Sequence, residues 1–213
     1  MSGLVYRSTV LSLAAQLLLG AVASIGFFLP IPEAYRADLQ LILAIELGSQ
    51  IVELLWYTVV VCRYNTITTW TRYIDWVIST PIMLVSTVFF FRHRSGDPLV
   101  LVFERPTVYI LLSLNWLMLL FGFLAERKQL SKMLALALGG AAFVGSFTLL
   151  ATFVKNVDVT SLAVFWTMYV VWGLYGVAAA LADTPKNVFY NGLDIVSKNF
   201  YGLFLTVYAI YLE

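Results

Sequence analysis

Seven long apolar runs constrain this chain more than any other feature of its sequence. A transmembrane helix takes about 20 mostly apolar residues, and runs of that length lie at about 8–29, 38–62, 72–91, 106–125, 133–154, 161–182 and 187–212. Only 12% of the 213 residues are charged and 61% are hydrophobic, whereas soluble domains carry about 25% charged residues. This composition excludes a soluble fold, a disordered chain and a nucleic-acid-binding protein. The sequence therefore predicts an all-α membrane protein, a bundle of seven transmembrane helices in a single domain over 1–213.

Three smaller features limit the interpretation further. The first run contains Ala21-Val22-Ala23, which is similar to a signal-peptidase site, but the apolar stretch continues to Pro30 and predicts a retained first helix. Lysines and arginines are spread almost evenly over the two sides of the seven predicted spans, so the positive-inside rule gives no orientation. One histidine and one cysteine leave no ligand set for a His- or Cys-based metal site, and we expect no bound metal.

Six ionisable residues lie inside the predicted spans, where charge is costly and usually functional. They are Glu46, Glu53, Arg72, Asp75, Asp194 and Lys198. Lys198 lies near the middle of its span, too deep for its ammonium group to reach the surface. Asp194 is four residues away, and helical spacing predicts that the two side chains reach each other. A structural ion pair and a lysine that forms a Schiff base with an aldehyde both remain open from these residues alone.

The residues around these charges decide between the two interpretations. Residues 72–81 read RYIDWVISTP, residues 193–202 read LDIVSKNFYG, and residues 172–175 read WGLY. Together they resemble the retinal-binding core of microbial (type 1) rhodopsins, and the resemblance extends over the whole chain in the number, order and length of the spans.

The resemblance implies a chromophore site. Lys198 would carry all-trans retinal as a protonated Schiff base, with Asp75 and Asp194 as counter-ions and Arg72 just outside them. The retinal pocket would be formed by Trp76, Thr80, Met118, Gly122, Trp172 and Tyr175. Flat aromatic walls suit an elongated apolar chromophore. The resemblance also implies an N-terminus outside the cell and a C-terminus in the cytoplasm, with no enzymatic activity.

Two positions depart from the pattern of outward proton pumps in this family. The position of the proton donor, eleven residues after Asp75, is Ser86, and the position of the release glutamate, eight residues before Asp194, is Lys186. A serine does not donate a proton at any useful pKa. A proton pump therefore remains an alternative only with Glu46 as the replacement donor.

Polar stripes on two of the spans point to an ion path. Glu46, Gln50, Glu53 and Tyr57 lie on one face of the span 38–62, and Ser8, Ser12 and Gln16 lie on one face of the first span. Such side chains also hold helices together by hydrogen bonds, which is the alternative for the first span. Carboxylates that line a pore select cations. We expect Glu46 and Asn199, with Ser12, to form a constriction, and Gln50 and Glu53 to lie further out.

Two further resemblances favour a channel. Glu46 and Asn199 are similar to the central gate of green-algal channelrhodopsins, and Thr80 and Asn115 fall where those channels place a gating pair that is usually Cys and Asp. The sequence also resembles viral rhodopsins of large DNA viruses. This resemblance lies in Glu46 and Glu53, in Ser12 and Gln16, and in the run that contains Lys186, Asn187 and Asn191.

The viral proteins are regarded as light-gated channels for monovalent cations that are sensitive to calcium. In that resemblance Lys186, Asn187 and Asn191 would lie near the outer mouth. The sequence therefore predicts a light-gated cation channel in a lipid bilayer, permeable to monovalent cations and protons, with calcium sensitivity as a further expectation. A proton pump and a sensory rhodopsin with a separate partner are the alternatives, and a homo-oligomer stays open.

Overall fold

The computed structural model describes residues 2–63, 68–154 and 158–211. In this part of the chain the structure is helical throughout, with short turns between the helices. The elements in chain order are α1 (Gly3–Ser24), the 3-10 turn η1 (Ile25–Phe28), α2 (Glu33–Cys62), the 3-10 turn η3 (Thr69–Thr71), α3 (Arg72–Arg94), the 3-10 turn η4 (Leu99–Glu104), α4 (Pro106–Glu126), α5 (Lys132–Ala151), α6 (Val159–Ala180), α7 (Asp183–Asp194), the π-helical turn η5 (Ile195–Asn199) and α8 (Phe200–Ile210).

The helices match the seven predicted spans in number and order. Six of the described helices are long and apolar enough to cross a membrane. The seventh crossing is α7, η5 and α8 in continuous succession, interrupted by the π turn. Several helices begin earlier than the apolar runs predict, because polar caps lengthen them: the Ser2 hydroxyl accepts a hydrogen bond from the Val5 amide, and α2 begins at the acidic Glu33. The last predicted residue of the seventh span lies outside the described residues.

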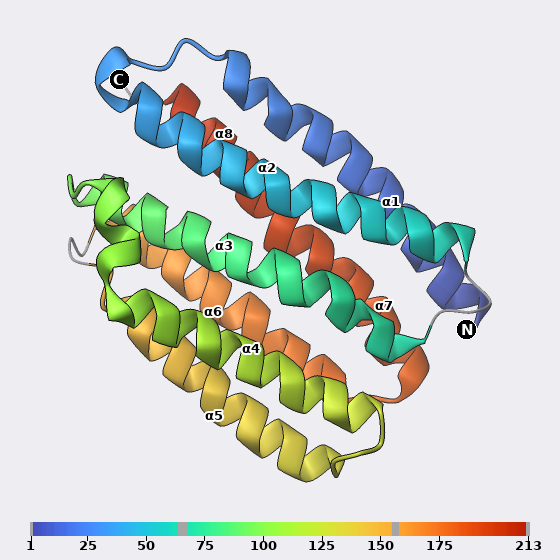
Figure 1. Ribbon diagram of the computed structural model, residues 1–213. Helices are drawn as coiled ribbons and strands as arrows, with labels where there is room; N and C mark the ends of the chain where they lie inside the picture. Colours follow the sequence, from blue (N-terminus) through green and yellow to red (C-terminus); the bar gives the residue numbers. More distant parts are fainter. Residues whose placement is uncertain (1, 64–67, 155–157, 212–213) are drawn as a thin grey trace.

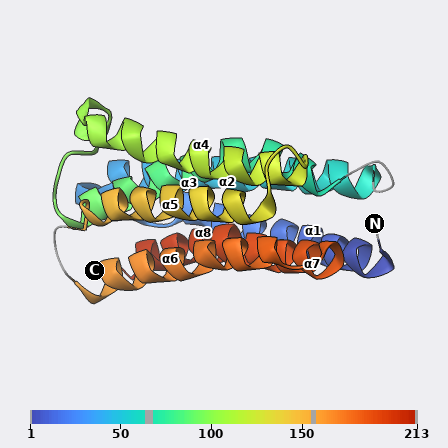
Figure 2. The same cartoon turned by 90° about the horizontal axis from the view of Figure 1, so that it is seen from below.

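The helices form a bundle in which α1 closes the ring by packing against both α2 and the last crossing. Figure 1 shows that α1 begins at one end of the bundle and α8 ends at the other. We refer to these as the N end and the C end. Figure 2 shows α2, α3 and α4 on one side of the bundle and α1, α6, α7 and α8 on the other, with α5 in front, between α4 and α6.

Apolar and polar side chains divide the interior along its length. The C-terminal half of α3 buries three consecutive phenylalanines, Phe89, Phe90 and Phe91, in a core shared with Phe147 and Trp172. Most of the buried charged and amide side chains gather instead among α1, α2, the first half of α3 and the last crossing, with Arg92 and Asn115 as the exceptions. The fold therefore places its aromatic core beside a polar interior that must satisfy its own hydrogen bonds.

The start of α6 shows how a loop end is fixed at the C end. Asp158 precedes the helix, and its carboxylate accepts hydrogen bonds from the backbone amides of Thr160 and Ser161, 2.9 and 3.0 Å away. Arg94 at the end of α3 donates to the same carboxylate over 2.9 Å. Slight burial alone would raise the pKa of Asp158, but the hydrogen bonds from Ser161 and Arg94 prevail and lower it to about 2. This carboxylate therefore links α3 to the N-terminus of α6.

Candidate functional site

Lys198 lies in the π turn of the last crossing, fully enclosed by the bundle. Its side chain is 1% exposed, and its Nζ donates to Asp75 Oδ2 over 2.8 Å and lies 3.4 Å from Glu53 Oε1. The predicted pairing with Asp194 is replaced by these two partners. In a π turn, backbone bonds span five residues instead of four, so spacing by four no longer brings side chains onto one face. The ion pair described for Asp194 is with Arg72.

Glu53 occupies a different place from the one predicted. The polar stripe predicts Glu53 further out along an ion path with Gln50, whereas the structure places its fully buried carboxylate beside Lys198. The buried cluster therefore contains three carboxylates, from Glu53, Asp75 and Asp194, and two cations, from Lys198 and Arg72. The formal charges do not balance, and one added proton would make the cluster neutral.

Asp194 is the acceptor that joins four helices. Its Oδ2 accepts hydrogen bonds from the Tyr57 hydroxyl over 2.6 Å and from Arg72 Nη1 over 3.5 Å. Its Oδ1 accepts from the Tyr175 hydroxyl over 2.7 Å and from Trp76 Nε1 over 3.3 Å. These donors come from α2, α3 and α6, and each carboxylate oxygen serves two of them. A carboxylate held in this way has one position and keeps its charge partnered.

Arg72 lies toward the N end of the bundle, where hydrogen bonds fix its guanidinium group. Its Nε donates to Asn187 Oδ1 over 3.1 Å, and its Nη2 donates to Asn191 Oδ1 over 2.5 Å. Asn191 in turn contacts α1, where its Nδ2 donates to Ser8 Oγ over 2.8 Å and its backbone carbonyl accepts from Ser12 Oγ over 3.1 Å. The structure thus brings the predicted residues Asn187, Asn191 and Ser12 together around the arginine, as hydrogen-bonded side chains.

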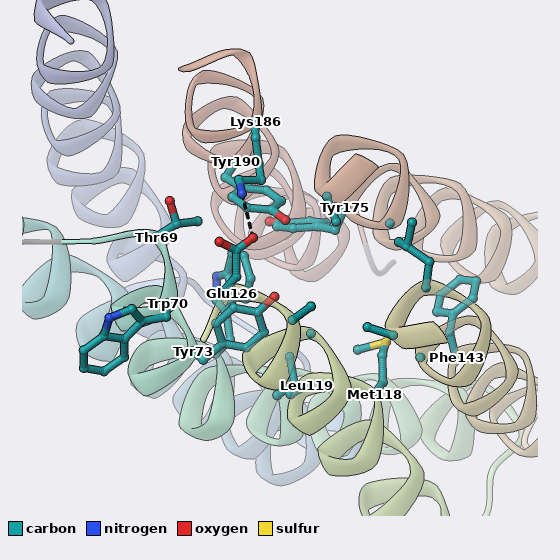
Figure 3. A pocket seen from close by; sticks show the side chains of 18 of the residues that line it. Thr69, Trp70, Tyr73, Met118, Leu119, Glu126, Phe143, Tyr175, Lys186 and Tyr190 are labelled. Carbon is teal, nitrogen blue, oxygen red and sulfur yellow. Dashed lines mark hydrogen bonds and ion pairs between the residues drawn. The ribbon is translucent and has the colours of Figure 1, made fainter. Parts of the chain in front are cut away.

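A cavity of about 630 Å³ extends between α3, α4, α5, α6 and the last crossing. Lys198 lies on its wall, and so do the six residues predicted to form a chromophore pocket: Trp76, Thr80, Met118, Gly122, Trp172 and Tyr175. Trp76 and Tyr175 meet edge to face, with ring centroids 5.4 Å apart and an interplanar angle of 90°. Figure 3 shows aromatic rings, among them Tyr73, Tyr175 and Phe143, lining this space from several helices. Rigid flat walls of this kind fit a long, thin apolar molecule.

The polar interior toward the C end has many groups without partners. In the described part of the chain, the buried polar side-chain atoms without a hydrogen-bond partner include atoms of Gln16, Glu46, Gln50, Ser86, Asn199 and Tyr201. The residues Glu46, Gln50, Ser86 and Tyr201 are neighbours, and Gln50 packs directly against the backbone of Gly202. Buried polar groups in this state attract water. At the adjoining α3–α4 contact, Asn115 Nδ2 donates to Thr80 Oγ1 over 2.8 Å.

Sequence reasoning missed several residues of this interior. Glu126 lies at the end of α4, where its Oε1 is 2.7 Å from Lys186 Nζ, as Figure 3 shows. Tyr73 rests its ring against Gly122, and Tyr201 adds a buried hydroxyl beside Glu46. Tyr201 is three residues after Lys198, and counting along the last span would have found it. Glu126 gave no signal, because it ends an apolar run and its partner lies three helices later.

Comparisons with known proteins agree with this architecture. The family model described as "Bacteriorhodopsin-like protein" matches residues 10–212. The opsin-like protein carO of Fusarium fujikuroi is 29% identical over 152 residues, which are 63% of this chain, and the chain spans only 46% of that relative.

Three solved structures are similar over nearly their whole length. The crystal structure of viral rhodopsin OLPVRII has a TM-score of 0.87 and 28% identity, over 96% of this chain and 97% of the other. A blue light-absorbing proteorhodopsin from Med12 has a TM-score of 0.77 and 20% identity, over 97% and 96%. The light-driven proton pump LR (Mac) from Leptosphaeria maculans has a TM-score of 0.75 and 15% identity, over 100% and 98%. The last two likenesses show the fold alone.

Proposed function

Since the chain belongs to the bacteriorhodopsin-like protein family, we propose that it is a retinal photoreceptor that conducts monovalent cations passively when it is lit. The family and the apolar helices imply an integral, multi-pass membrane protein and a retinal chromophore. We infer the all-trans isomer, and an orientation with the N end of the bundle outside the cell. When bound, retinal supplies light absorption and a change of shape and charge on isomerisation.

The residues of the cavity fit this group. Lys198 lies on the wall at the enclosed end of the cavity, buried beside the carboxylates of Asp75 and Glu53. Joining its Nζ to an aldehyde carbon releases the aldehyde oxygen as water and leaves the nitrogen able to carry a proton. Asp75 would accept the hydrogen bond from that nitrogen, and Trp76, Trp172 and Tyr175 would hold the polyene in place. A carboxyl oxygen of Asp75 without a partner leaves room for a transferred proton.

The observation that supports conduction is the unpartnered polar interior toward the C end. Glu46, Gln50, Ser86 and Asn199 are at most 4% exposed, yet each has a polar atom without a hydrogen-bond partner. Leaving such a group unsatisfied costs about 1–3 kcal/mol, so water entering this region would be stabilised. A hydrated path that begins next to Lys198 and passes a carboxylate would favour cations.

Whole-cell recording under illumination tests this proposal, with the sodium, potassium and proton gradients varied separately. We expect a photocurrent that reverses at a potential that follows the cation gradients. A current that stays outward at every voltage would contradict the channel. A Lys198→Ala variant supplied with retinal should show neither visible absorbance nor photocurrent, and a coloured variant would end the assignment of Lys198.

A light-driven proton pump is the second candidate, and the position of Glu46 favours it. The Glu46 carboxyl is fully buried and lies near Ser86, which occupies the position of the pump's usual donor. Flash spectroscopy of Glu46→Gln separates the two functions. Slower reprotonation of the chromophore linkage with little change in passive current would identify Glu46 as a donor, whereas altered ion selectivity would place it in a pore.

A further inference from the structure

The cavity is larger than the chromophore pocket and continues to the surface at the N end of the bundle. We call the part beyond Trp76 and Tyr175 the N-end chamber. Its wall consists of the small residues Thr69, Ala125 and Ala179 and the aromatic residues Trp70 and Tyr73, and the charged residues Glu126, Asp183 and Lys186 lie at its outer end. Asp183 is exposed, so the chamber meets solvent there. Lys198 lies at the other, enclosed end of the same cavity.

An ion pair covers the chamber. Lys186 Nζ lies 2.7 Å from Glu126 Oε1 and 3.0 Å from Asp183 Oδ1, and the lysine is only 5% exposed. Figure 3 shows the bond between Lys186 and Glu126 above the ring of Tyr73. The Tyr73 ring packs against Gly122, because glycine has no side chain that would occupy the space of the ring. The cover therefore consists of side chains, which rotate, and not of packed backbone.

The rim of the chamber has the composition of a membrane–water boundary. The Arg127 guanidinium lies 5.0 Å from the centre of the Trp70 ring, and Lys128 and Lys132 also line the opening. Tryptophan and basic residues gather at the level of the lipid headgroups. A retinoid dissolved in a bilayer keeps its carbonyl at that level, because a carbonyl without a hydrogen bond in hydrocarbon is unfavourable.

We propose that the N-end chamber is the route by which the retinoid aldehyde reaches Lys198, with the Lys186–Glu126 ion pair as its cover. The opening lies where the aldehyde end of the molecule is found, and the aldehyde is the end that must reach the lysine. The small residues Ala125 and Ala179 leave room for passage, and the aromatic pocket beyond them holds the molecule once it arrives. This inference rests on the proposed retinal function.

The test is the rate at which apoprotein in lipid nanodiscs takes up added retinal, followed by growth of the visible absorption band. Ala179→Trp narrows the chamber and should slow uptake about tenfold or more. Ala180→Trp is the matched control, because Ala180 is exposed, adjacent on α6 and not on the cavity wall. Equal rates in these two variants would overturn the proposal.

A second variant has the opposite expected sign and does not depend on a bulky residue being tolerated. Lys186→Met removes the cover and should speed uptake about fivefold. An unchanged or slower rate in this variant would count against the cover. The same ordering of rates is expected for retinol, which cannot join the lysine, entering Lys198→Ala apoprotein, read as quenching of tryptophan fluorescence.

Two further outcomes have separate meanings. Gly140 and Gly176 also line the cavity and are exposed, and an added side chain on either would meet no neighbour within 4 Å. If Gly176→Leu slows uptake while Ala179→Trp does not, the molecule enters between α5 and α6 and the proposal is wrong. If the native apoprotein never becomes coloured, the retinal function itself fails, whereas colour with equal rates in all variants rejects only the route.

Discussion

Replacing Asp194 with asparagine leaves two hydrogen-bond donors facing an NH2 group, whichever way the new amide lies. One carboxylate oxygen accepts from Tyr57 and Arg72, and the other accepts from Tyr175 and Trp76. An asparagine side chain has one oxygen and one NH2 group, and the NH2 group accepts nothing. In either orientation one of the two donors facing the NH2 group is a tyrosine, whose hydroxyl can turn to another acceptor, Asn191 Oδ1 for Tyr57 or Ser197 Oγ for Tyr175. The other donor, Arg72 or Trp76, loses its acceptor on residue 194.

The size of the effect follows from this count. A hydrogen bond to a charged group contributes about 1.5–3 kcal/mol, so the loss of one such bond destabilises the fold by roughly 1.5–3 kcal/mol. For a chain of this length, each kcal/mol shifts the melting temperature by about 2–4 °C, which gives a decrease of roughly 3–12 °C. The Arg72 guanidinium keeps its bonds to Asn187 and Asn191, and this places the expected value toward the lower end.

The assay is thermal unfolding of apoprotein in detergent, followed by intrinsic tryptophan fluorescence, with Asp75→Asn as the matched control. Asp75 has one oxygen bonded to Lys198 and one without a partner. Its asparagine can keep the oxygen on the lysine, and Glu53 still lies 3.4 Å from that lysine. The control should therefore lose much less stability, while its chromophore should absorb further to the red. Equal losses in the two variants, or a loss below about 1 kcal/mol for Asp194→Asn, would refute this reasoning.

Three more predictions follow from separate parts of the bundle. Glu46→Gln should change photocurrent size or ion selectivity more than colour, which paired action spectra and recordings would show. Gly202→Ala should destabilise the apoprotein by about 1–3 kcal/mol, because the new methyl group meets the Gln50 side chain, and adding Gln50→Ala should restore its melting temperature. Asp158→Ala should cost about 1 kcal/mol as a lost helix cap. Because the pKa of Asp158 is lowered to about 2, its contribution should be full above the usual pKa of about 4 and disappear as pH falls through 2, as melting curves against pH would show.

The sequence was sufficient for the fold and for much of the site because charge inside an apolar run is visible without a structure. Arg72, Asp75, Asp194 and Lys198 each interrupt a run that is otherwise apolar, and desolvation makes such interruptions rare unless they are paired. Which of these charged residues form ion pairs with one another could not be predicted from the sequence. The ion pairs depend on which faces of separate helices meet, and the periodicity of a single helix contains no information on that.

The error in the Lys198 pairing has a definite physical source. Counting four residues from Asp194 assumes a regular helix, whereas the chain makes a π turn over Ile195–Asn199. The turn redirects the lysine toward α2 and α3, where Glu53 and Asp75 lie. Nothing in the residue types of that segment distinguishes a π turn from an α turn, so only the packed structure reveals that Glu53 belongs to the lysine's surroundings.

The two halves of the polar interior differ in a way that bears on how a conducting state would arise. Toward the C end, the Asn199 side-chain amide is already without a hydrogen-bond partner, and water can bind it without breaking a protein bond. Toward the N end, Arg72 is bound to Asn187, Asn191, Tyr57 and Asp194, and a fixed guanidinium in the path repels cations. If this interior conducts cations, as we propose, opening requires that Arg72 move, and its attachment to Asp194 makes its position depend on how charge is distributed around Lys198. A proton that moves from the Lys198 nitrogen onto Asp75 redistributes these charges without changing their sum. Asn191→Ala, which removes one of Arg72's acceptors, should therefore ease opening and increase the photocurrent without removing the chromophore's colour. A smaller photocurrent at unchanged expression and colour would place the barrier elsewhere.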